Sequence, residues 1–405
     1  MPTIQPFRGL RPSAGCAADV AAPPYDVLSS AEARARAAGK PNSFLHISKA
    51  EIDLPVDTNP YSPEVYAKSA ENFHRLIGEG LLIRDPAPCY YAYRLTMGEH
   101  VQTGIVAAAS VADYNSNRIR RHEFTRPDKE DDRVRQIEAL SAQTGPVLLA
   151  YPDSAAADEL IASASGREPV AEASFDGVGH TIWLIDDAMT ISALSAAFDA
   201  MPGLYIADGH HRSAAAARVA AARPGCAGAG HFLAVIFPAH QMRIMDYNRV
   251  VRDLNDLAPD AFLASVGEHF AVIPAVDRVH PDKPGVVGMY LAGHWYRLEI
   301  DPALVPHDDP VRRLDVSLLS DQLLEPLLGI RDLRRDKRID FVGGIRGLGE
   351  LERRVDSGEM AVAFALHATQ MSDLMAVADS GQVMPPKSTW FEPKLADGLV
   401  SHILD

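Results

Sequence analysis

The sequence predicts an α+β fold, and three observations support this prediction. Apolar runs rich in β-branched and aromatic residues recur with the length of buried strands, as at residues 204–207 and 232–237. Two longer runs, residues 89–95 and 101–111, flank a short glycine-containing turn and therefore predict a β-hairpin. Residues 63–79 carry apolar side chains at helical spacing, which predicts an amphipathic helix among the strands.

Capping residues and helix breakers set the expected ends of the helices. Ser29 or Ser30 is expected to cap a helix at residues 31–38, because a serine hydroxyl accepts hydrogen bonds from the first free N–H groups. A helix at residues 127–142 would begin with Pro127 and acidic side chains, both of which are favourable there. The remaining expected helices are residues 155–163, 190–198, 213–222, 254–270, 316–328 and 372–379. The remaining expected strands are residues 43–47, 147–150, 181–185, 285–291, 294–300 and 360–366.

Composition and charge limit the classes of function. The chain has 405 residues, of which 47% are apolar and 23% are charged, as in ordinary globular proteins. The formal net charge of −15 argues against a protein that coats nucleic acid, because neutralising phosphates requires a basic face. A local basic site is compatible with this total, so we expect small-molecule partners and no nucleic-acid partner.

Targeting segments and cysteines indicate the cellular setting. No apolar run approaches the length of a membrane span, and the first residues contain no signal-peptide core, so a cytoplasmic protein without a membrane partner is expected. The three cysteines, Cys16, Cys89 and Cys226, form neither a CxxC pair nor an even disulfide set. A thiol-based site or a structural zinc site is therefore not expected.

One stretch joins a strand, a polar turn and a helix start. The apolar run at residues 204–207 leads into an Asp-Gly-His-His-Arg segment at residues 208–212, and the alanine-rich residues 213–222 predict a helix after it. The free N–H groups and positive dipole end of such a helix favour an anion, and Arg212 adds a bidentate donor for phosphate or carboxylate. The structural alternative is that Asp208 caps the helix and the two histidines are surface turn residues.

A second polar segment lies between the strand expected at residues 101–111 and the helix that follows. It contains His122, Glu123 and Arg126, in a loop of the kind that commonly holds reactive groups. The alternative for the charge run at residues 128–135 is a solvated helix face.

The C-terminal region, residues 251–405, is expected to add further α+β elements to an α+β core at residues 1–250 that carries the anion-binding turn and the candidate catalytic loop. Its segment at residues 383–394 contains three prolines, which exclude regular structure. This tail could fold back and place Lys387 on an anionic ligand, and a packing tether is the alternative.

Five segments occur in order along the chain: Pro-Phe-Arg at 6–8, Pro-Pro-Tyr-Asp-Val at 23–27, Arg-His-Glu-Phe-Thr-Arg-Pro-Asp-Lys-Glu-Asp-Asp-Arg at 121–133, Asp-Gly-His-His-Arg at 208–212 and Met-Pro-Pro-Lys-Ser-Thr at 384–389. Together they resemble the bacterial and archaeal family DUF1015. The fourth segment also resembles the phosphate motif of the ParB/sulfiredoxin superfamily, which includes free-serine kinases. The resemblance implies a mixed-sheet, ParB/sulfiredoxin-like core that transfers a phosphoryl group from ATP or ADP, with Mg²⁺, to the hydroxyl of free L-serine.

Phosphoryl transfer needs cationic donors around the phosphates, and this need assigns the binding residues. Gly209 lets backbone N–H groups approach the phosphate oxygens, while His210, His211 and Arg212 can donate to them. Further candidate phosphate partners are Arg126, Lys129, Arg133 and Lys387.

The attacking hydroxyl needs a base or an orienting group. The resemblance points to Glu123, which matches a His-Glu pair of the serine kinases, with His122 as the alternative. Asp208 has three open roles, because it can cap the helix, orient His210 or face Mg²⁺.

Other reaction classes remain open or are excluded. The chain has no GxxxxGK[ST] motif and no HRD or DFG set, which excludes the P-loop and protein-kinase mechanisms. Two alternatives remain: a nucleotide-binding regulator of the ParB type, and a nucleotide hydrolase in which water replaces the acceptor. Sulfiredoxin chemistry is disfavoured because His210 stands where a thiol would be needed.

Overall fold

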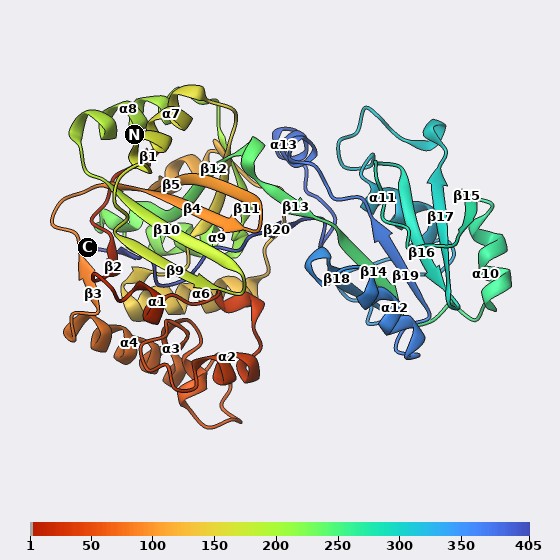
Figure 1. The fold of residues 1–405 in the computed structure, drawn as a ribbon, viewed down its shortest axis with the longest axis horizontal. Helices are drawn as coiled ribbons and strands as arrows, with labels where there is room; N and C mark the ends of the chain where they lie inside the picture. The colour runs from red at the N-terminus through yellow and green to blue at the C-terminus, as the bar shows by residue number, and fades with distance from the viewer. Residues whose placement is uncertain (1–2) are drawn as a thin grey trace. The chain divides into compact units, whose positions relative to one another are not determined.

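The computed structural model describes residues 3–405, which fold into two units (Figure 1). Unit 1 contains the described residues up to Met242 together with Pro393–Asp405, and unit 2 is Arg243–Glu392. Both units mix helices and strands, so the α+β class is confirmed. The boundary expected at residue 250 falls within β14 (Tyr247–Val251), whose strand partners belong to unit 2.

Unit 1 is built on a nine-stranded sheet. Its strands are β1 (Ile4–Gln5), β4 (Tyr90–Met97), β5 (His100–Ser110), β6 (Ile119–Arg120), β8 (Val147–Tyr151), β9 (Ala171–Phe175), β10 (Val178–Ile185), β11 (Leu204–Asp208) and β12 (His231–Pro238). The strand order is β6, β11, β8, β12, β5, β4, β10, β9, and β1 pairs with β5. β6 with β11 and β8 with β12 are parallel pairs and the others are antiparallel, so the predicted mixed sheet is confirmed.

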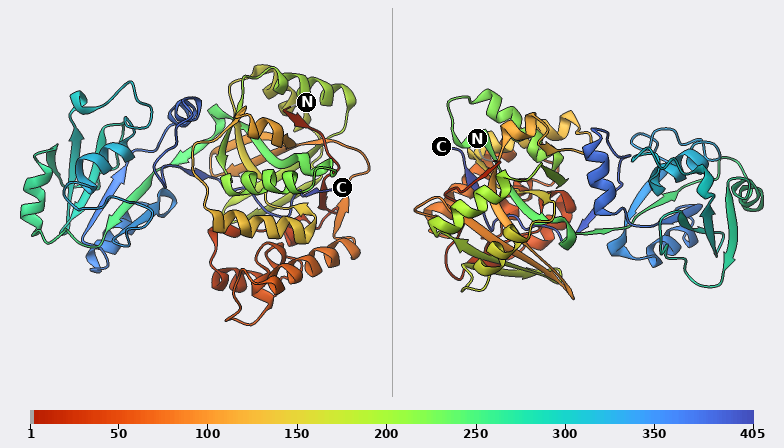
Figure 2. Two further views of the ribbon diagram at one scale, coloured as in Figure 1. Left: turned by 180° about the vertical axis from the view of Figure 1, so that it is seen from behind. Right: turned by 90° about the horizontal axis from the view of Figure 1, so that it is seen from above.

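Helices cover this sheet in unit 1. They are α1 (Ala17–Val20), α2 (Ser30–Ala37), α3 (Leu45–Ser48), α4 (Pro63–Gly78), α5 (Val111–Asn115), α6 (Pro127–Leu140), α7 (Ala155–Ala164), α8 (Ala188–Asp199) and α9 (His210–Ala222). Figures 1 and 2 show α7 and α8 at one side of the unit and α2, α3 and α4 at the opposite side. α6 packs on α9 through a buried cluster that includes Ile137, Ala215 and Val219. This packing holds the start of α9 beside the loop that precedes α6.

Two predictions of local structure in unit 1 are confirmed. β4 and β5 form the predicted hairpin, with Gly98 in the turn at a φ of 59°. Ser29 caps α2 in a capping box with Glu32, because each side chain accepts a hydrogen bond from the backbone of the other residue. Two further short ladders complete the unit: β2 (Leu10–Pro12) with β3 (Leu82–Arg84), and β7 (Ala142–Gln143) with β21 (His402–Ile403).

The strand expected at residues 43–47 is wrong, since this stretch forms α3. The N–H of Ile47 donates to the carbonyl oxygen of Phe44 at 2.9 Å, so the backbone bonds are local. Phe44 and Leu45 are buried with the other N-terminal helices. A short apolar run carries no periodicity that distinguishes a strand from one buried helical turn.

Unit 2 is built on a six-stranded antiparallel sheet. In spatial order its strands are β15 (Phe270–Ala275), β17 (His294–Ile300), β16 (Val286–Leu291), β19 (Val362–Leu366), β14 and β18 (Ile339–Gly343). Its helices are α10 (Pro259–Val266), α11 (Asp315–Leu319), the π-helical η6 (Ser320–Leu324), α12 (Gly349–Asp356) and α13 (Met371–Asp379). The hairpin of β16 and β17 confirms the pairing expected at residues 285–300.

Three expectations in unit 2 are corrected. The helix expected at residues 254–270 is limited to α10, because Asn255 and Asp256 have left-handed φ values of 54° and 64° and Phe270 already begins β15. The helix expected at residues 316–328 is α11 continued by η6, which ends at Leu324. The tail is not wholly irregular, because β20 (Trp390–Glu392) pairs with β13 (Arg243–Met245) between its prolines.

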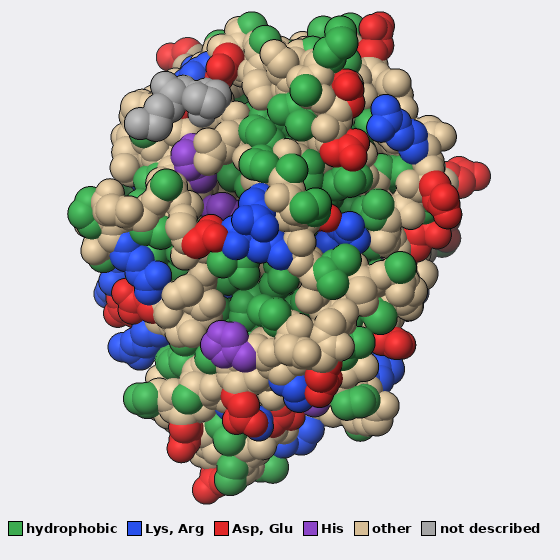
Figure 3. Space-filling model, turned by 90° about the vertical axis from the view of Figure 1, so that its left-hand side faces the viewer, with side chains coloured by type: hydrophobic (Ala, Val, Ile, Leu, Met, Phe, Trp, Pro, Cys, Tyr) green, Lys and Arg blue, Asp and Glu red, His purple; other side chains and the backbone are tan. Residues whose placement is uncertain are grey.

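The surface carries both signs of charge. The face drawn in Figure 3 has acidic and basic side chains interspersed with apolar and neutral ones. This mixture differs from the basic stripe by which proteins follow a phosphate backbone. Within residues 3–405, none of the helices combines the length and the apolar content that crossing a membrane requires.

Candidate functional site

The Asp-Gly-His-His-Arg segment is divided between a strand and a helix. Asp208 ends β11 and α9 begins at His210, so the two histidines and Arg212 form the first helical turn. Gly209 is the N-cap residue, with φ 95° and ψ 28°, a left-handed conformation that favours glycine. Its N–H donates to Asp208 Oδ1 at 2.8 Å, and no side chain caps the helix. The N-cap role considered for Asp208 is therefore wrong, and the first-turn N–H groups are left to other acceptors.

Strand pairing brings the second polar segment to this helix start. β6 and β11 are parallel, with Leu204 opposite Ile119 and Tyr205 opposite Arg120. The carboxyl ends of neighbouring parallel strands lie at the same edge of a sheet, so the loop after β6 leaves the sheet beside the turn after β11. This loop, residues 121–126, carries His122 and Glu123.

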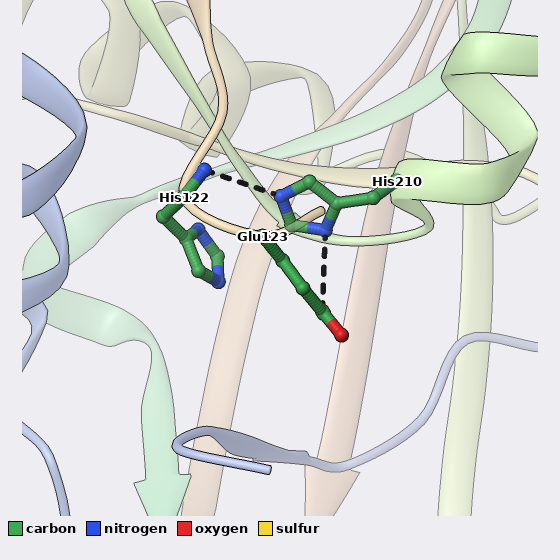
Figure 4. A group of neighbouring side chains, drawn as sticks. All are labelled: His122, Glu123 and His210. Carbon is green, nitrogen blue, oxygen red and sulfur yellow. Dashed lines mark hydrogen bonds and ion pairs between the residues drawn. The ribbon is translucent and has the colours of Figure 1, made fainter. Parts of the chain in front are cut away.

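His122, Glu123 and His210 lie in contact at this edge (Figure 4). The backbone N–H of His122 donates to His210 Nε2 at 3.4 Å, and Glu123 Oε2 lies 3.7 Å from His210 Nδ1. The two imidazole rings meet edge to face, with centroids 4.5 Å apart. Both histidines are buried, whereas the Glu123 side chain is 43% exposed. The carboxylate of Glu123 is thus the member of this group that solvent and small molecules reach.

Burial keeps the two histidines neutral at pH 7. It lowers the pKa of His122 to about 4, and it lowers the pKa of His210 well below the ordinary value, with the neighbouring His122 adding to the effect. Because His210 Nε2 accepts the N–H of His122, the single ring proton of neutral His210 belongs on Nδ1. That proton faces Glu123.

Arg212 is held by acidic and carbonyl oxygens. Its side chain is 9% exposed, Nη1 donates to the carbonyl oxygen of Pro146, and Nη2 lies 3.6 Å from Asp26 Oδ2 and 3.7 Å from Asp208 Oδ2. Burial alone would lower the pKa of Arg212, but Asp26 and Asp208 raise it above the ordinary value. The guanidinium packs over Gly209 so closely that a Cβ there would lie 3.0 Å from Arg212 Nε. An anion at this helix start would share the guanidinium with Asp26 and Asp208.

Asp208 does not fit the Mg²⁺ position that the sequence suggested for it. Its Oδ2 lies 3.6 Å from Lys394 Nζ as well as 3.7 Å from Arg212 Nη2. Burial raises the pKa of Asp208, but the nearby cations Lys394 and Arg212 lower it by a larger amount. The pKa of Asp208 therefore lies well below its ordinary value. Two cations beside one carboxylate neutralise it and repel a divalent ion.

The tail contributes a lysine other than the expected one. Lys394 belongs to unit 1 and reaches Asp208, whereas Lys387 belongs to unit 2, where its Nζ lies 5.5 Å from the ring centre of Tyr247. Lys387 has a left-handed φ of 61°. Sequence reasoning missed Lys394 because both lysines stand in the same proline-rich segment and no spacing rule separates them.

The other expected cations have partners of their own. The backbone N–H of Arg126 donates to His211 Nε2 at 3.0 Å, while the Arg126 guanidinium pairs with Asp128 at 2.7 Å and is mostly exposed. Lys129 Nζ donates to the hydroxyl of Tyr61 at 2.7 Å. The backbone of Arg126 therefore orients the ring of His211, and its guanidinium is directed to Asp128.

Arg133 lines a small cavity behind Arg212. Its guanidinium lies 3.8 Å from the ring centre of Tyr25 and pairs with Asp132 at 2.7 Å. The cavity, about 30 Å³, is also lined by Arg212 and Asp397 and has room for water but not for a nucleotide. This cavity is therefore not itself a nucleotide site.

Asp397 is a buried acid that sequence reasoning did not find. Burial raises its pKa to about 7, an effect that Arg212 partly offsets and that Asp26 increases. A raised pKa in the folded state means that the folded protein binds more protons than the unfolded chain between about pH 4 and pH 7. Asp397 therefore makes the free energy of unfolding fall as the pH rises through this window.

We expect Asp397→Asn to remove this contribution, because asparagine does not titrate. Relative to the unsubstituted protein, the variant should gain stability as the pH rises from 4 to 7, by at most about 1.4 kcal/mol per pH unit. Urea unfolding of both proteins at several pH values measures the difference. Parallel pH profiles for the two proteins would contradict the assignment.

Three solved structures are similar in part to this chain. A free serine kinase in complex with AMP shares 12% sequence identity, covers 71% of this chain and 86% of its own, and has a TM-score of 0.35. A conserved hypothetical protein from Pyrococcus furiosus shares 14% identity, with 72% and 93% coverage and a TM-score of 0.36, and SbnI with a C-terminal truncation from Staphylococcus aureus shares 11% identity, with 72% and 85% coverage and a TM-score of 0.38. No curated protein matches the chain in sequence. The family described as "Protein of unknown function (DUF1015)" matches residues 4–317, which span most of the chain. The chain therefore belongs to the DUF1015 family.

Proposed function

We propose that the protein is a small-molecule kinase that transfers a phosphoryl group from ATP or ADP to a hydroxyl group, that of free L-serine being the first candidate. The start of α9 would hold the phosphates through the N–H groups of its first turn, with Arg212 and Lys394 as nearby cations. Glu123 would accept the proton of the acceptor hydroxyl. The likeness of the Asp-Gly-His-His-Arg segment to the phosphate motif of the free-serine kinases supports the choice of reaction.

One observation carries the proposal: a reachable carboxylate stands beside an uncapped helix start. Glu123 Oε2 lies 3.7 Å from Nδ1 of His210, the first residue of α9, and its side chain is 43% exposed. Phosphoryl transfer depends mainly on positioning and charge stabilisation. A base adjacent to a phosphate-binding turn supports simultaneous binding of a phosphate and an acceptor hydroxyl.

The atoms of this transfer balance between the acceptor hydroxyl, the nucleotide and Glu123. The acceptor oxygen forms a bond to the terminal phosphorus of the nucleotide, and the bond from that phosphorus to the bridging oxygen breaks. The hydroxyl proton passes to Glu123, and the nucleotide leaves one phosphate shorter. The N–H of His210 Nδ1 faces the same carboxylate and would help to hold it in place beside the acceptor hydroxyl.

The test is a screen of the purified full-length protein with Mg²⁺, ATP or ADP, and a panel of small hydroxyl compounds that includes L-serine. Mass spectrometry should detect a phosphorylated acceptor that forms only with the protein and nucleotide present. Inorganic phosphate released equally with and without acceptor would overturn the kinase in favour of the hydrolase. Nucleotide binding without turnover would favour the regulator.

A further inference from the structure

The cluster of His122, Glu123 and His210 has the composition of a metal site. One ligand atom from each of the three residues lies within 4.8 Å of the other two. Ligands of a tetrahedral zinc ion stand about 3.4 Å apart, given metal–ligand distances of about 2.1 Å. The 3.7 Å between His210 Nδ1 and Glu123 Oε2 is near that spacing. A His122 nitrogen lies within 4.8 Å of a donor atom of each of these residues, so a rotation of its side chain would complete a set of three donors.

His122 supplies an independent observation. Its side chain is 1% exposed, and neither ring nitrogen makes a well-aligned hydrogen bond among residues 3–405. A polar neighbour of the ring is the backbone of Ile206, which raises the pKa of His122 but does not offset the effect of burial. Buried polar atoms without a partner are rare in folded proteins, and a metal ion is one of the groups that satisfies them. Figure 4 shows that the ring of His122 and the side chain of Glu123 leave the loop toward the same side, where His210 reaches over from α9.

We propose that His122, Glu123 and His210 bind one divalent transition-metal ion of the Zn²⁺ class. Two imidazole nitrogens and one carboxylate oxygen suit such an ion, whereas Mg²⁺ prefers oxygen ligands and retains its waters. The Glu123 side chain is 43% exposed, so solvent would reach an ion bound to its carboxylate. Sites with three protein ligands and an open position are typical of reactive rather than structural zinc.

Metal binding would move one proton within the ring of His210. The ion needs the lone pair of His210 Nδ1, so the ring proton of neutral His210 moves from Nδ1 to Nε2. Nε2 then no longer accepts the N–H of His122, and the 3.4 Å contact between them opens.

The metal inference stands apart from the proposed kinase, although both use Glu123. Metal binding is measured on the protein without nucleotide, and phosphoryl transfer is measured with Mg²⁺ and nucleotide. Metal binding without transfer would refute the kinase alone, and transfer without metal binding would refute the metal site alone. Where both hold, saturating Zn²⁺ should suppress transfer, because the coordinated carboxylate no longer accepts a proton.

The experiment titrates the chelator-treated full chain with Zn²⁺ by calorimetry and with Co²⁺ by visible absorption. We expect one equivalent of each ion to bind, with the intense d–d bands of four-coordinate Co²⁺, and an excess of Mg²⁺ not to compete. His122→Phe keeps a buried ring without nitrogens and should weaken Zn²⁺ binding by at least about tenfold, as should Glu123→Gln.

His240→Gln is the matched control, because His240 is an exposed histidine paired with Asp153 at 3.0 Å outside the cluster. This variant should bind Zn²⁺ like the unsubstituted protein. Thermal unfolding checks that His122→Phe is folded, and Glu123→Gln carries the test if it is not, since Glu123 is half-exposed. Unchanged Zn²⁺ affinity in the folded cluster variants, loss of it in His240→Gln, or equal competition by Mg²⁺ would overturn the site.

Discussion

Glu123→Gln is expected to bind nucleotide normally and to lose phosphoryl transfer by roughly 10²- to 10⁴-fold, the usual contribution of a general base. The amide has nearly the shape of the carboxylate, so the half-exposed side chain can keep its place beside His210. It cannot accept the hydroxyl proton at neutral pH. The loss should therefore appear in kcat and leave the affinity for ATP unchanged.

The measurement pairs product formation by mass spectrometry with nucleotide binding by calorimetry. Glu138→Gln is the matched control, because Glu138 is an exposed glutamate on α6 and should leave both readouts unchanged. Turnover of Glu123→Gln at the level of the unsubstituted protein would show that another group accepts the proton. His122 would not be the next candidate, because its side chain is only 1% exposed and an acceptor hydroxyl cannot reach it.

Arg212→Ala is expected to abolish measurable nucleotide binding and to lower the free energy of unfolding by about 3–5 kcal/mol, as when one partner of a buried ion pair is removed. Asp26 and Asp208 would lose the cation that lies within 3.7 Å of both, and the carbonyl oxygen of Pro146 would lose its donor. The same residue therefore supports ligand binding and the fold.

Urea unfolding and calorimetric titration with ATP measure the two effects separately. Arg218→Ala on the same helix is the control, because Arg218 is 45% exposed and its pairs with Glu130 and Asp131 lie at the surface. Such surface pairs contribute about 0–1 kcal/mol. A stability loss for Arg212→Ala no larger than that of Arg218→Ala would contradict the role given to the buried guanidinium.

The local elements of the site were predictable from nearby residues. The apolar run of β11, the glycine after it and the alanine-rich helix α9 follow from strand pattern, turn chemistry and helix propensity. Pro127 at the start of α6 is another signal of this kind. Each depends on atoms within a few residues of one another, so the sequence carries the information directly.

Expectations failed where a short segment was compatible with two structures. The apolar residues 43–47 became helix α3, and the N-cap position went to Gly209 rather than Asp208. In the first case burial against the N-terminal helices decided the conformation. In the second, the Asp208 carboxylate turned to the Gly209 N–H and to two cations.

The sequence by itself determined the α+β class, the hairpin of β4 and β5, and the strand, glycine and helix start of the Asp-Gly-His-His-Arg segment. Only the tertiary structure decided which distant residues meet there. The parallel pairing of β6 with β11 brings Glu123 to the start of α9, and the return of the tail places Lys394 on Asp208. Propensity and spacing act over a few residues, whereas the meeting of distant segments depends on the strand order and packing of the whole unit.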